Sequence, residues 1–181
     1  MPKVLSYPKD GLPHFIDDDW VWKESFDANQ MASGKVLVAW SDWRNLPEDS
    51  PIKKLKPGSQ VGIVLSPEDD VFELVGPDPD GSWRWHLIAL NFPIFRDGRG
   101  FSQAHLLRHR LGWTGELRAV GDVLIDQLRQ MARVGFDAFS LRNDQNQDWA
   151  IEQSQKQADA LVVVSSWSVH HLSCHQVHQD F

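Results

Sequence analysis

Short apolar runs alternate along most of the chain with amphipathic or turn-rich stretches. Four of these runs have the composition of strands that are buried on both faces of a sheet. They lie at 60–65, 86–91, 116–120 and 136–141. An earlier run, Val36 to Trp40, follows Ser33-Gly34 and predicts a further short strand. After it, Asn45 to Gly58 contains three prolines and reads as a connector.

Helices are predicted between these strands. Ser66 is the expected N-cap of a helix that begins at Pro67, and acidic residues follow in its first turn. Asp122 is the expected N-cap of a longer helix, in which Leu124, Leu128 and Met131 share a face. The longer helices are predicted at 102–111, 123–134 and 148–158.

Strands that alternate with helices predict an α/β fold with a mostly parallel sheet built from β-α units. Two architectures fit this pattern, an open doubly wound sheet and a partial TIM-like barrel. We expect a single domain over 1–160, with 1–60 as an irregular, strand-containing lead packed on it. Residues 161–181 are expected to form a disordered or dispensable tail.

The composition is that of a folded globular protein, with 41% apolar and 24% charged residues. The N-terminal residues contain no apolar run of the length found in signal peptides, and no apolar run in the sequence is long enough to span a membrane. The single cysteine, Cys174, excludes an internal disulfide and a cysteine-ligated cluster within this chain. We therefore expect a cytoplasmic protein. The sequence identifies no cofactor.

Arginines are concentrated in one part of the chain. Residues 83–119 contain six arginines and two acidic residues, a local charge of +4, in a chain whose net charge is −7. Such a segment favours a small anionic ligand or an acidic partner surface. The acidic chain as a whole argues against nucleic-acid binding.

The loop Asp97-Gly98-Arg99-Gly100 follows a buried strand and opens the helix that contains Ser102. In parallel α/β sheets, ligands bind at the carboxyl ends of the strands. The two glycines would allow backbone N–H groups to point into one concavity, the helix start adds positive potential, and Arg99 adds a planar donor fork. The expected ligand is sulfite, phosphate or a carboxylate. The alternative is an ordinary tight turn at Asp97-Gly98.

Further candidates lie on the next strand and helix. Glu116 and Arg118 share a face of the 116–120 strand, and Arg118 is either a second anion-binding residue or one half of a local ion pair. Asp122 lies at the carboxyl end of that strand, where it would join Asp97, Arg99 and Arg118 in one pocket. Asp97, Asp122 and Asp126 are the candidate acid–base groups, and a helix-dipole role is the alternative for Asp126.

Metal binding is not expected. His105 and His109 are four residues apart on one predicted helix, but no third ligand lies nearby. The tail contains His171, Cys174 and His175, which we interpret as an adventitious cluster. The sequence has no dinucleotide fingerprint, P-loop, nucleophile elbow or HExxH motif.

Three motifs occur in order and at close spacing: FRDGRGFS at 95–102, GELRAVGDVLIDQL at 115–128 and GFDAF at 135–139. In these motifs the chain resembles the bacterial family of unknown function numbered 934. The resemblance is strong over 86–141, weak over 14–85 and absent in the tail.

This resemblance implies a role in assimilatory sulfite reduction, as an accessory or electron-transfer component that works with the sulfite reductase haemoprotein. The family has no established catalytic residues that could be assigned to positions in this chain. Two alternatives are an enzyme that acts on a small phosphorylated or carboxylated metabolite at the 97–102 loop, and a non-catalytic interaction protein.

Overall fold

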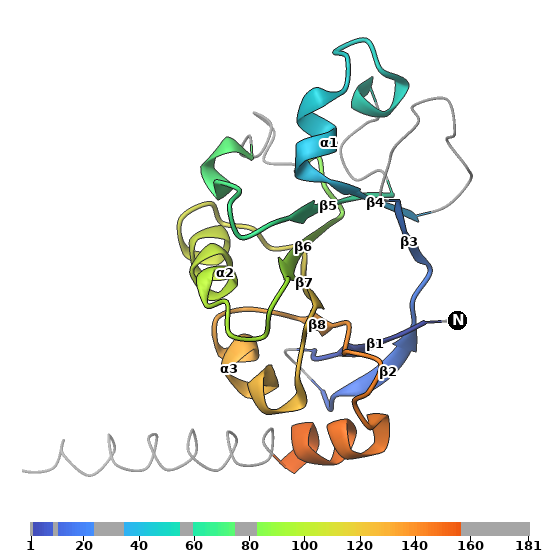
Figure 1. Cartoon of the computed structure of the whole chain (residues 1–181), viewed down its shortest axis with the longest axis vertical. Helices are drawn as coiled ribbons and strands as arrows, with labels where there is room; N and C mark the ends of the chain where they lie inside the picture. Colours follow the sequence, from blue (N-terminus) through green and yellow to red (C-terminus); the bar gives the residue numbers. More distant parts are fainter. Residues whose placement is uncertain (1, 9–10, 24–34, 55–59, 75–82, 157–181) are drawn as a thin grey trace, which may run out of the picture.

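The computed structural model of the chain describes residues 2–8, 11–23, 35–54, 60–74 and 83–156. Within these residues eight strands form one sheet, in the order β2-β1-β8-β7-β6-β5-β4-β3 (Figure 1). The strands are β1 (Lys3–Ser6), β2 (His14–Asp17), β3 (Trp20–Lys23), β4 (Lys35–Ala39), β5 (Val61–Leu65), β6 (Leu87–Phe92), β7 (Glu116–Gly121) and β8 (Ala138–Phe139). The helices are α1 (Trp40–Asn45), α2 (Arg99–His109), α3 (Leu128–Arg133) and a last helix at 147–156, and the 3-10 turns are η1 (Pro51–Lys54), η2 (Val71–Glu73) and η3 (Ile125–Gln127).

Strands β3 to β8 are parallel, and each one pairs with the next strand along the chain. The prediction that the strands near 61–65, 86–91, 116–120 and 136–140 lie parallel in one sheet is therefore confirmed. Their long apolar runs are buried because helices cover one face and side chains fill the other; β5, for example, is buried along its whole length.

The sheet is mixed and curled. Strand β1 runs antiparallel to both β2 and β8, so the N-terminal lead supplies a hairpin at one end of the parallel part. The order of the parallel strands has no reversal, which differs from a doubly wound sheet. No strand pairing joins β2 to β3, and the sheet is an open, curled α/β half-barrel within the described residues.

Two layers of apolar side chains hold the curl together. The larger layer lies between the sheet and the helices, which are on the outside of the curl (Figure 1). Register places Leu37, Gly62 and Leu87 side by side on the other, inner face. The inner cluster comprises Trp20, Leu37, Val64, Leu87, Ala89 and Val120.

Two predicted helix starts are wrong. Ser66 does not cap a helix at Pro67: the Asp69 carboxylate accepts hydrogen bonds from the backbone N–H and the hydroxyl of Ser66, so a turn replaces the helix. Only the short η2 follows, and its N-cap is Asp70. Gly76 and Pro77, the turn residues expected to end this helix, lie outside the described residues.

The helix predicted at 123–134 is shorter, because Val123 packs in the core and its carbonyl accepts a hydrogen bond from the Arg142 N–H. This pairing holds Val123 outside any helix, and α3 begins only at Leu128, after the turn η3. The other predicted elements differ at their ends. Helix α2 begins three residues before the predicted start, β4 ends at Ala39, and Trp40 opens α1.

The predicted tail, 161–181, lies outside the described residues. Among the residues that the structure describes, no helix combines the length and the hydropathy that a membrane crossing requires.

Candidate functional site

The carboxyl ends of the parallel strands form one edge of the sheet, and the loops that follow β5, β6, β7 and β8 emerge there. This edge is where parallel α/β sheets bind ligands. The predicted site, 97–102, comprises the end of the 93–98 loop that connects β6 to α2 and the first residues of α2, and it therefore lies on this edge. Side chains from the neighbouring loops hold it in place.

Arg99 and Asp97 form a closed pair at the start of α2. The Arg99 Nε and Nη2 donate to the Asp97 carboxylate at 2.9 and 2.6 Å, and the Arg99 backbone N–H donates to it at 3.1 Å. The Arg99 Nη1 lies 3.0 Å from Glu68. The hydrogen bonds from Arg99 lower the pKa of Asp97. The chain's own carboxylate thus occupies the position that the sequence suggested for a bound anion.

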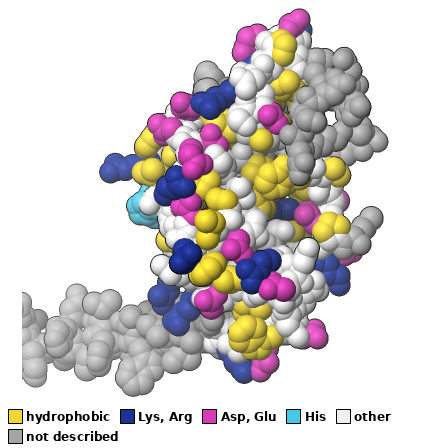
Figure 2. Space-filling model, in the orientation of Figure 1, with side chains coloured by type: hydrophobic (Ala, Val, Ile, Leu, Met, Phe, Trp, Pro, Cys, Tyr) yellow, Lys and Arg dark blue, Asp and Glu magenta, His cyan; other side chains and the backbone are white. Residues whose placement is uncertain are grey.

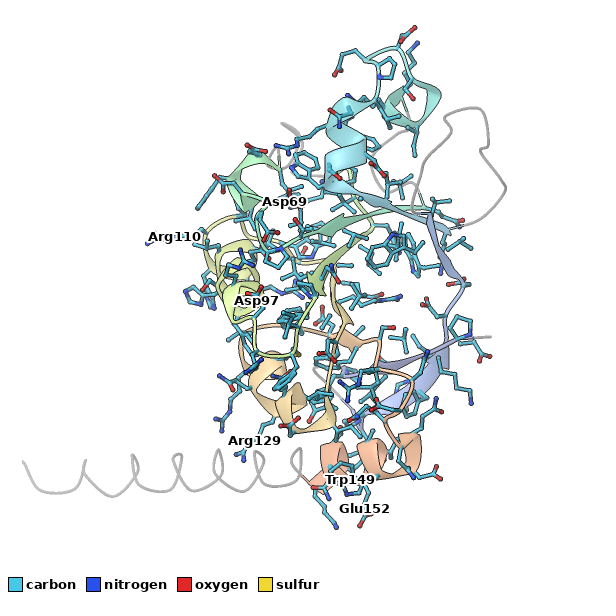
Figure 3. All side chains as sticks on the ribbon, viewed as in Figure 1. Asp69, Asp97, Arg110, Arg129, Trp149 and Glu152 are labelled. Atoms are coloured by element: carbon cyan, nitrogen blue, oxygen red, sulfur yellow. The ribbon has the colours of Figure 1, made fainter. Side chains whose placement is uncertain are left out.

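The other loop residues have ordinary structural surroundings. Gly98 has a right-handed φ of −77°, and Gly100 lies inside α2 against the Phe92 ring. Neither glycine has the left-handed conformation that would turn neighbouring N–H groups into one concavity. Ser102 is an exposed residue of α2. Figure 3 shows Asp97 beside this helix.

Asp122 joins the loop after β6 to the loop after β8. Its carboxylate accepts hydrogen bonds from the Phe95 N–H at 2.9 Å and from the Arg142 Nη1 at 2.7 Å. The Gln127 side chain donates to the Phe95 carbonyl at 2.6 Å. The predicted proximity of Asp122 to the first loop is therefore found, but Asp122 caps no helix. It fixes the backbone at Phe95.

Arg118 lies apart from these groups. It is 2% exposed on the inner face of β7, where it donates to Asp18 at 2.8 Å and to Glu116 at 2.9 Å. The structure therefore brings Asp97 and Arg99 together and places Asp122 on the neighbouring loop, whereas Arg118 points into the curl. Of the two interpretations of Arg118, the ion pair with Glu116 is present, and Asp18 is a second partner.

The remaining candidates are on the surface. Asp126 is exposed in η3. The rings of His105 and His109 lie with their centroids 4.4 Å apart and their planes tilted by 36°, on the exposed side of α2. Among the described residues no three His, Cys, Asp or Glu side chains gather where they could hold a metal ion. The histidines and Cys174 of the tail lie outside this part of the chain.

The arginine-rich segment does not form one basic patch. Arg84 donates to the Lys53 carbonyl, and Arg108 is bound by three backbone carbonyls and the Asp137 carboxylate. Arg118 lies in the interior. Figure 2 shows basic and acidic side chains interspersed over one face of the molecule. Three of the six arginines therefore cross-link distant parts of the chain.

The sequence interpretation missed the residues that hold the site together. Arg142 donates to Asp122, and Gln127 donates to the Phe95 carbonyl. Ile94 and Phe95 lie exposed on the loop, at 52% and 37%. The guanidinium of Arg96 lies 5.6 Å from the centre of the Phe95 ring. The position of Arg142, three residues after β8, was a usable signal, because residues at the carboxyl ends of parallel strands meet at one edge.

This arrangement is suited to binding rather than to proton transfer. Asp97 and Asp122 are both committed to arginine partners, and the pKa of Asp97 is held below its usual range. A general acid or base at neutral pH needs a pKa near 7. What the loop presents to solvent is an apolar tip with a cation beside it.

The comparison with protein-family models gives one match, described as "Bacterial protein of unknown function (DUF934)", over residues 62–161. The match extends beyond 86–141 on both sides, so it includes β5 from its second residue onward and all of the last helix that the structure describes. No curated protein and no solved structure matches the chain. The match covers more than half of the chain, and the protein belongs to the bacterial family of unknown function numbered 934.

Proposed function

We propose that this protein is a cytoplasmic accessory component of assimilatory sulfite reduction, which docks on a partner protein through the 93–99 loop. The sulfite-reduction part rests on the resemblance of the motifs at 95–139 to the bacterial family numbered 934. The docking part rests on one observation: Ile94 and Phe95 are exposed on a loop in which both the N–H and the carbonyl of Phe95 are hydrogen bonded to side chains of neighbouring segments.

Fixing an exposed apolar tip favours association. Large apolar side chains that fill a partner pocket commonly dominate the binding free energy of an interface. A loop that is already ordered loses less conformational entropy on binding, so more of the contact energy remains as affinity. Asp122 and Gln127 provide this order at Phe95, and Arg96 adds a cation that suits an acidic rim on the partner.

Anion binding at the same loop is the second part of the proposal. The Arg99 side chain is 53% exposed, and its fork is shared by Asp97 and Glu68. A free sulfite or phosphate ion must compete with these two carboxylates. A carboxylate on a docked partner has an advantage, because the apolar contacts hold it at a high effective concentration.

An electron-transfer form of this role requires a redox cofactor. A visible absorption spectrum of the purified protein tests it: a bound flavin supports electron transfer, whereas a colourless protein leaves docking as the function.

The experiment for docking is a quantitative pulldown or titration with the sulfite reductase haemoprotein. The double variant Ile94→Ser, Phe95→Ser should bind at least about tenfold more weakly, since each truncated anchor of this kind typically costs more than about 1 kcal/mol. The matched control is Leu12→Ser, which is 56% exposed and precedes β2, at the opposite edge of the sheet. Equal binding by the wild type and the double variant would remove the loop as the docking element, and no binding by the wild type would remove this partner.

A further inference from the structure

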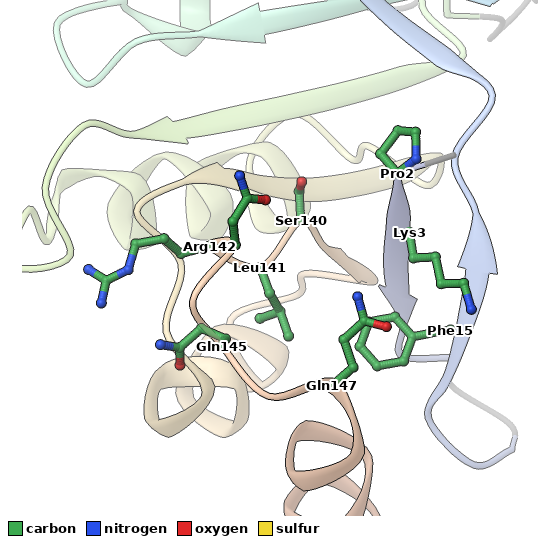
Figure 4. Close-up of a pocket in the computed structure, with 9 residues that line it drawn as sticks. Pro2, Lys3, Phe15, Ser140, Leu141, Arg142, Gln145 and Gln147 are labelled. Atoms are coloured by element: carbon green, nitrogen blue, oxygen red, sulfur yellow. The ribbon is translucent and has the colours of Figure 1, made fainter.

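A second feature of the carboxyl edge lies beyond the proposed docking loop. It is a pocket of about 280 Å³ between the β1–β2 hairpin and the segment that leads from β8 into the last helix (Figure 4). Because β1 runs antiparallel to β8, the first residues of β1 lie beside the carboxyl end of β8. The lining residues are Pro2, Lys3, Phe15, Ser140, Leu141, Arg142, Asn143, Gln145 and Gln147.

The polar part of the lining is rich in hydrogen-bond donors. It contains two cations, a hydroxyl and three side-chain amides, and none of the nine residues is Asp or Glu. The Arg142 nitrogens are already hydrogen bonded to Asp122 and Asp144, and Figure 4 shows this side chain pointing away from Lys3 and Phe15. Lys3 pairs in register with Asp17, but no ion pair joins them in the structure. The Lys3 ammonium group is therefore the cation available to a ligand.

The apolar part of the lining limits the kind of ligand. Its apolar residues are Pro2, Phe15 and Leu141; Phe15 lies on β2, and Leu141 lies on the segment after β8 (Figure 4). A bare inorganic anion would leave these apolar side chains in contact with water. A ligand with an anionic head and a short hydrocarbon body would satisfy Lys3 and the amides and also cover the apolar surface.

We propose that this pocket binds a small organic carboxylate, with the carboxylate at Lys3 and the hydrocarbon body against Phe15 and Leu141. This site is separate from the proposed docking loop, and it goes beyond the proposed function. The two assignments also fail separately, because Lys3 and Phe15 make no contribution to the Ile94–Phe95 tip.

The test is an NMR titration of the full-length protein with butyrate, followed through the backbone amide signals. Butyrate should shift the signals of Lys3, Phe15 and 140–147 in a saturable way. Lys3→Met should weaken binding by about tenfold or more, because it removes a charged hydrogen bond and keeps the side-chain length. The matched control is Lys54→Met, an exposed lysine of η1, which should bind butyrate like the wild type.

Two further probes separate the ligand classes. 1-Butanol has the same number of carbon atoms without the charge, and phosphate has charge without a hydrocarbon body; both should bind more weakly than butyrate. Phosphate binding as tight as that of butyrate would overturn the carboxylate assignment, and 1-butanol binding as tight would overturn the role of Lys3. Shifts that do not saturate, or that persist unchanged in Lys3→Met, would overturn the site itself.

Discussion

The Arg142 side chain ties the loop that follows β8 to the loop that follows β7. Its guanidinium group bonds to Asp144 through Nε at 2.7 Å and Nη2 at 2.8 Å, a bidentate pair, and reaches Asp122 with Nη1. The hydrogen bonds from Arg142 are the largest cause that lowers the pKa of Asp144, to about 2. Arg142 therefore links the candidate pocket to the loop that carries Phe95.

The Asp144 pair gives a pH prediction. Because the folded-state pKa lies below the ordinary value of 3.8, the pair stabilises the protein above pH 3.8, and this contribution is lost as the pH falls through about 2. An NMR titration of the Asp144 carboxyl carbon should give a midpoint near 2. Arg142→Gln should raise the midpoint toward 3.8, whereas Arg133→Gln, an exposed arginine of α3, should leave it unchanged. A midpoint that Arg142→Gln does not move would contradict the assignment.

The unit formed by β6, β7 and the start of α2 depends on close backbone approach. Gly121 ends β7 with a φ of +95°, and a Cβ there would lie 2.6 Å from the Asn91 Oδ1 and nearer still to the Phe92 carbonyl oxygen. Gly98, in contrast, has a φ of −77° and open space around the position of a Cβ. Glycine is therefore required by the backbone and its surroundings at position 121, but not at position 98.

We expect Gly121→Ala and Gly98→Ala to change stability in opposite directions or by very different amounts. Gly121→Ala combines a left-handed φ with a steric clash, and should lower the free energy of unfolding by more than about 1 kcal/mol. Gly98→Ala should be neutral or stabilising by up to about 1 kcal/mol, because it reduces the entropy of the unfolded chain without strain. Urea unfolding of both variants measures the difference. Equal destabilisation would mean that Gly98 has a steric role that its surroundings do not reveal.

The parallel strands could be predicted because their signal is local. β5 and β6 are nearly continuous apolar runs, and β7 is apolar except for Glu116 and Arg118. Turn residues flank these strands, and their neighbours in the sheet are their neighbours in the chain. The β1–β2 hairpin gave no such signal. β2 contains only HFID and is mostly exposed, and its partner pairs with β8 from the other end of the chain. Propensity cannot reveal a pairing of this kind.

The position of the candidate site in the fold could be predicted from the sequence, but the partners of its side chains could not. Its position after β6 followed from the rule for parallel sheets. Whether Arg99 faces a ligand or Asp97 depends on side-chain geometry, and the i, i+2 spacing fits both. Asp18 and Arg118 are 100 residues apart, so that no local pattern pointed to their ion pair.

The whole sheet is connected end to end by the chain itself. Its two edge strands, β2 and β3, are separated only by Asp18 and Asp19, so one segment pairs with β1 at its start and with β4 at its end. Arg118 reaches across the inside of the curl from β7 to Asp18, whose carboxylate also accepts a hydrogen bond from the Trp20 N–H. Arg118 therefore anchors the segment that joins the two edge strands of the half-barrel.

This topology predicts where the molecule loosens when Arg118 is removed. Arg118→Met leaves Asp18 and Glu116 without their cation, and should lower the free energy of unfolding by about 3–5 kcal/mol, the usual cost of an uncompensated buried charge. Hydrogen exchange should accelerate most at the amides of β2 and β3, the two strands that the Asp18 contact holds in position.

Arg108→Met is the matched control, because Arg108 is also a largely buried arginine with a carboxylate partner, Asp137. Its contacts are with the Gly115 and Gly135 carbonyls, near the starts of β7 and β8, so exchange should accelerate there and not at β2 and β3. If both variants accelerate exchange uniformly over all strands, the Arg118–Asp18 pair contributes only to global stability. A difference confined to β2 and β3 identifies it as the contact that closes the curl, because no hydrogen-bonded strand pairing joins those two edges.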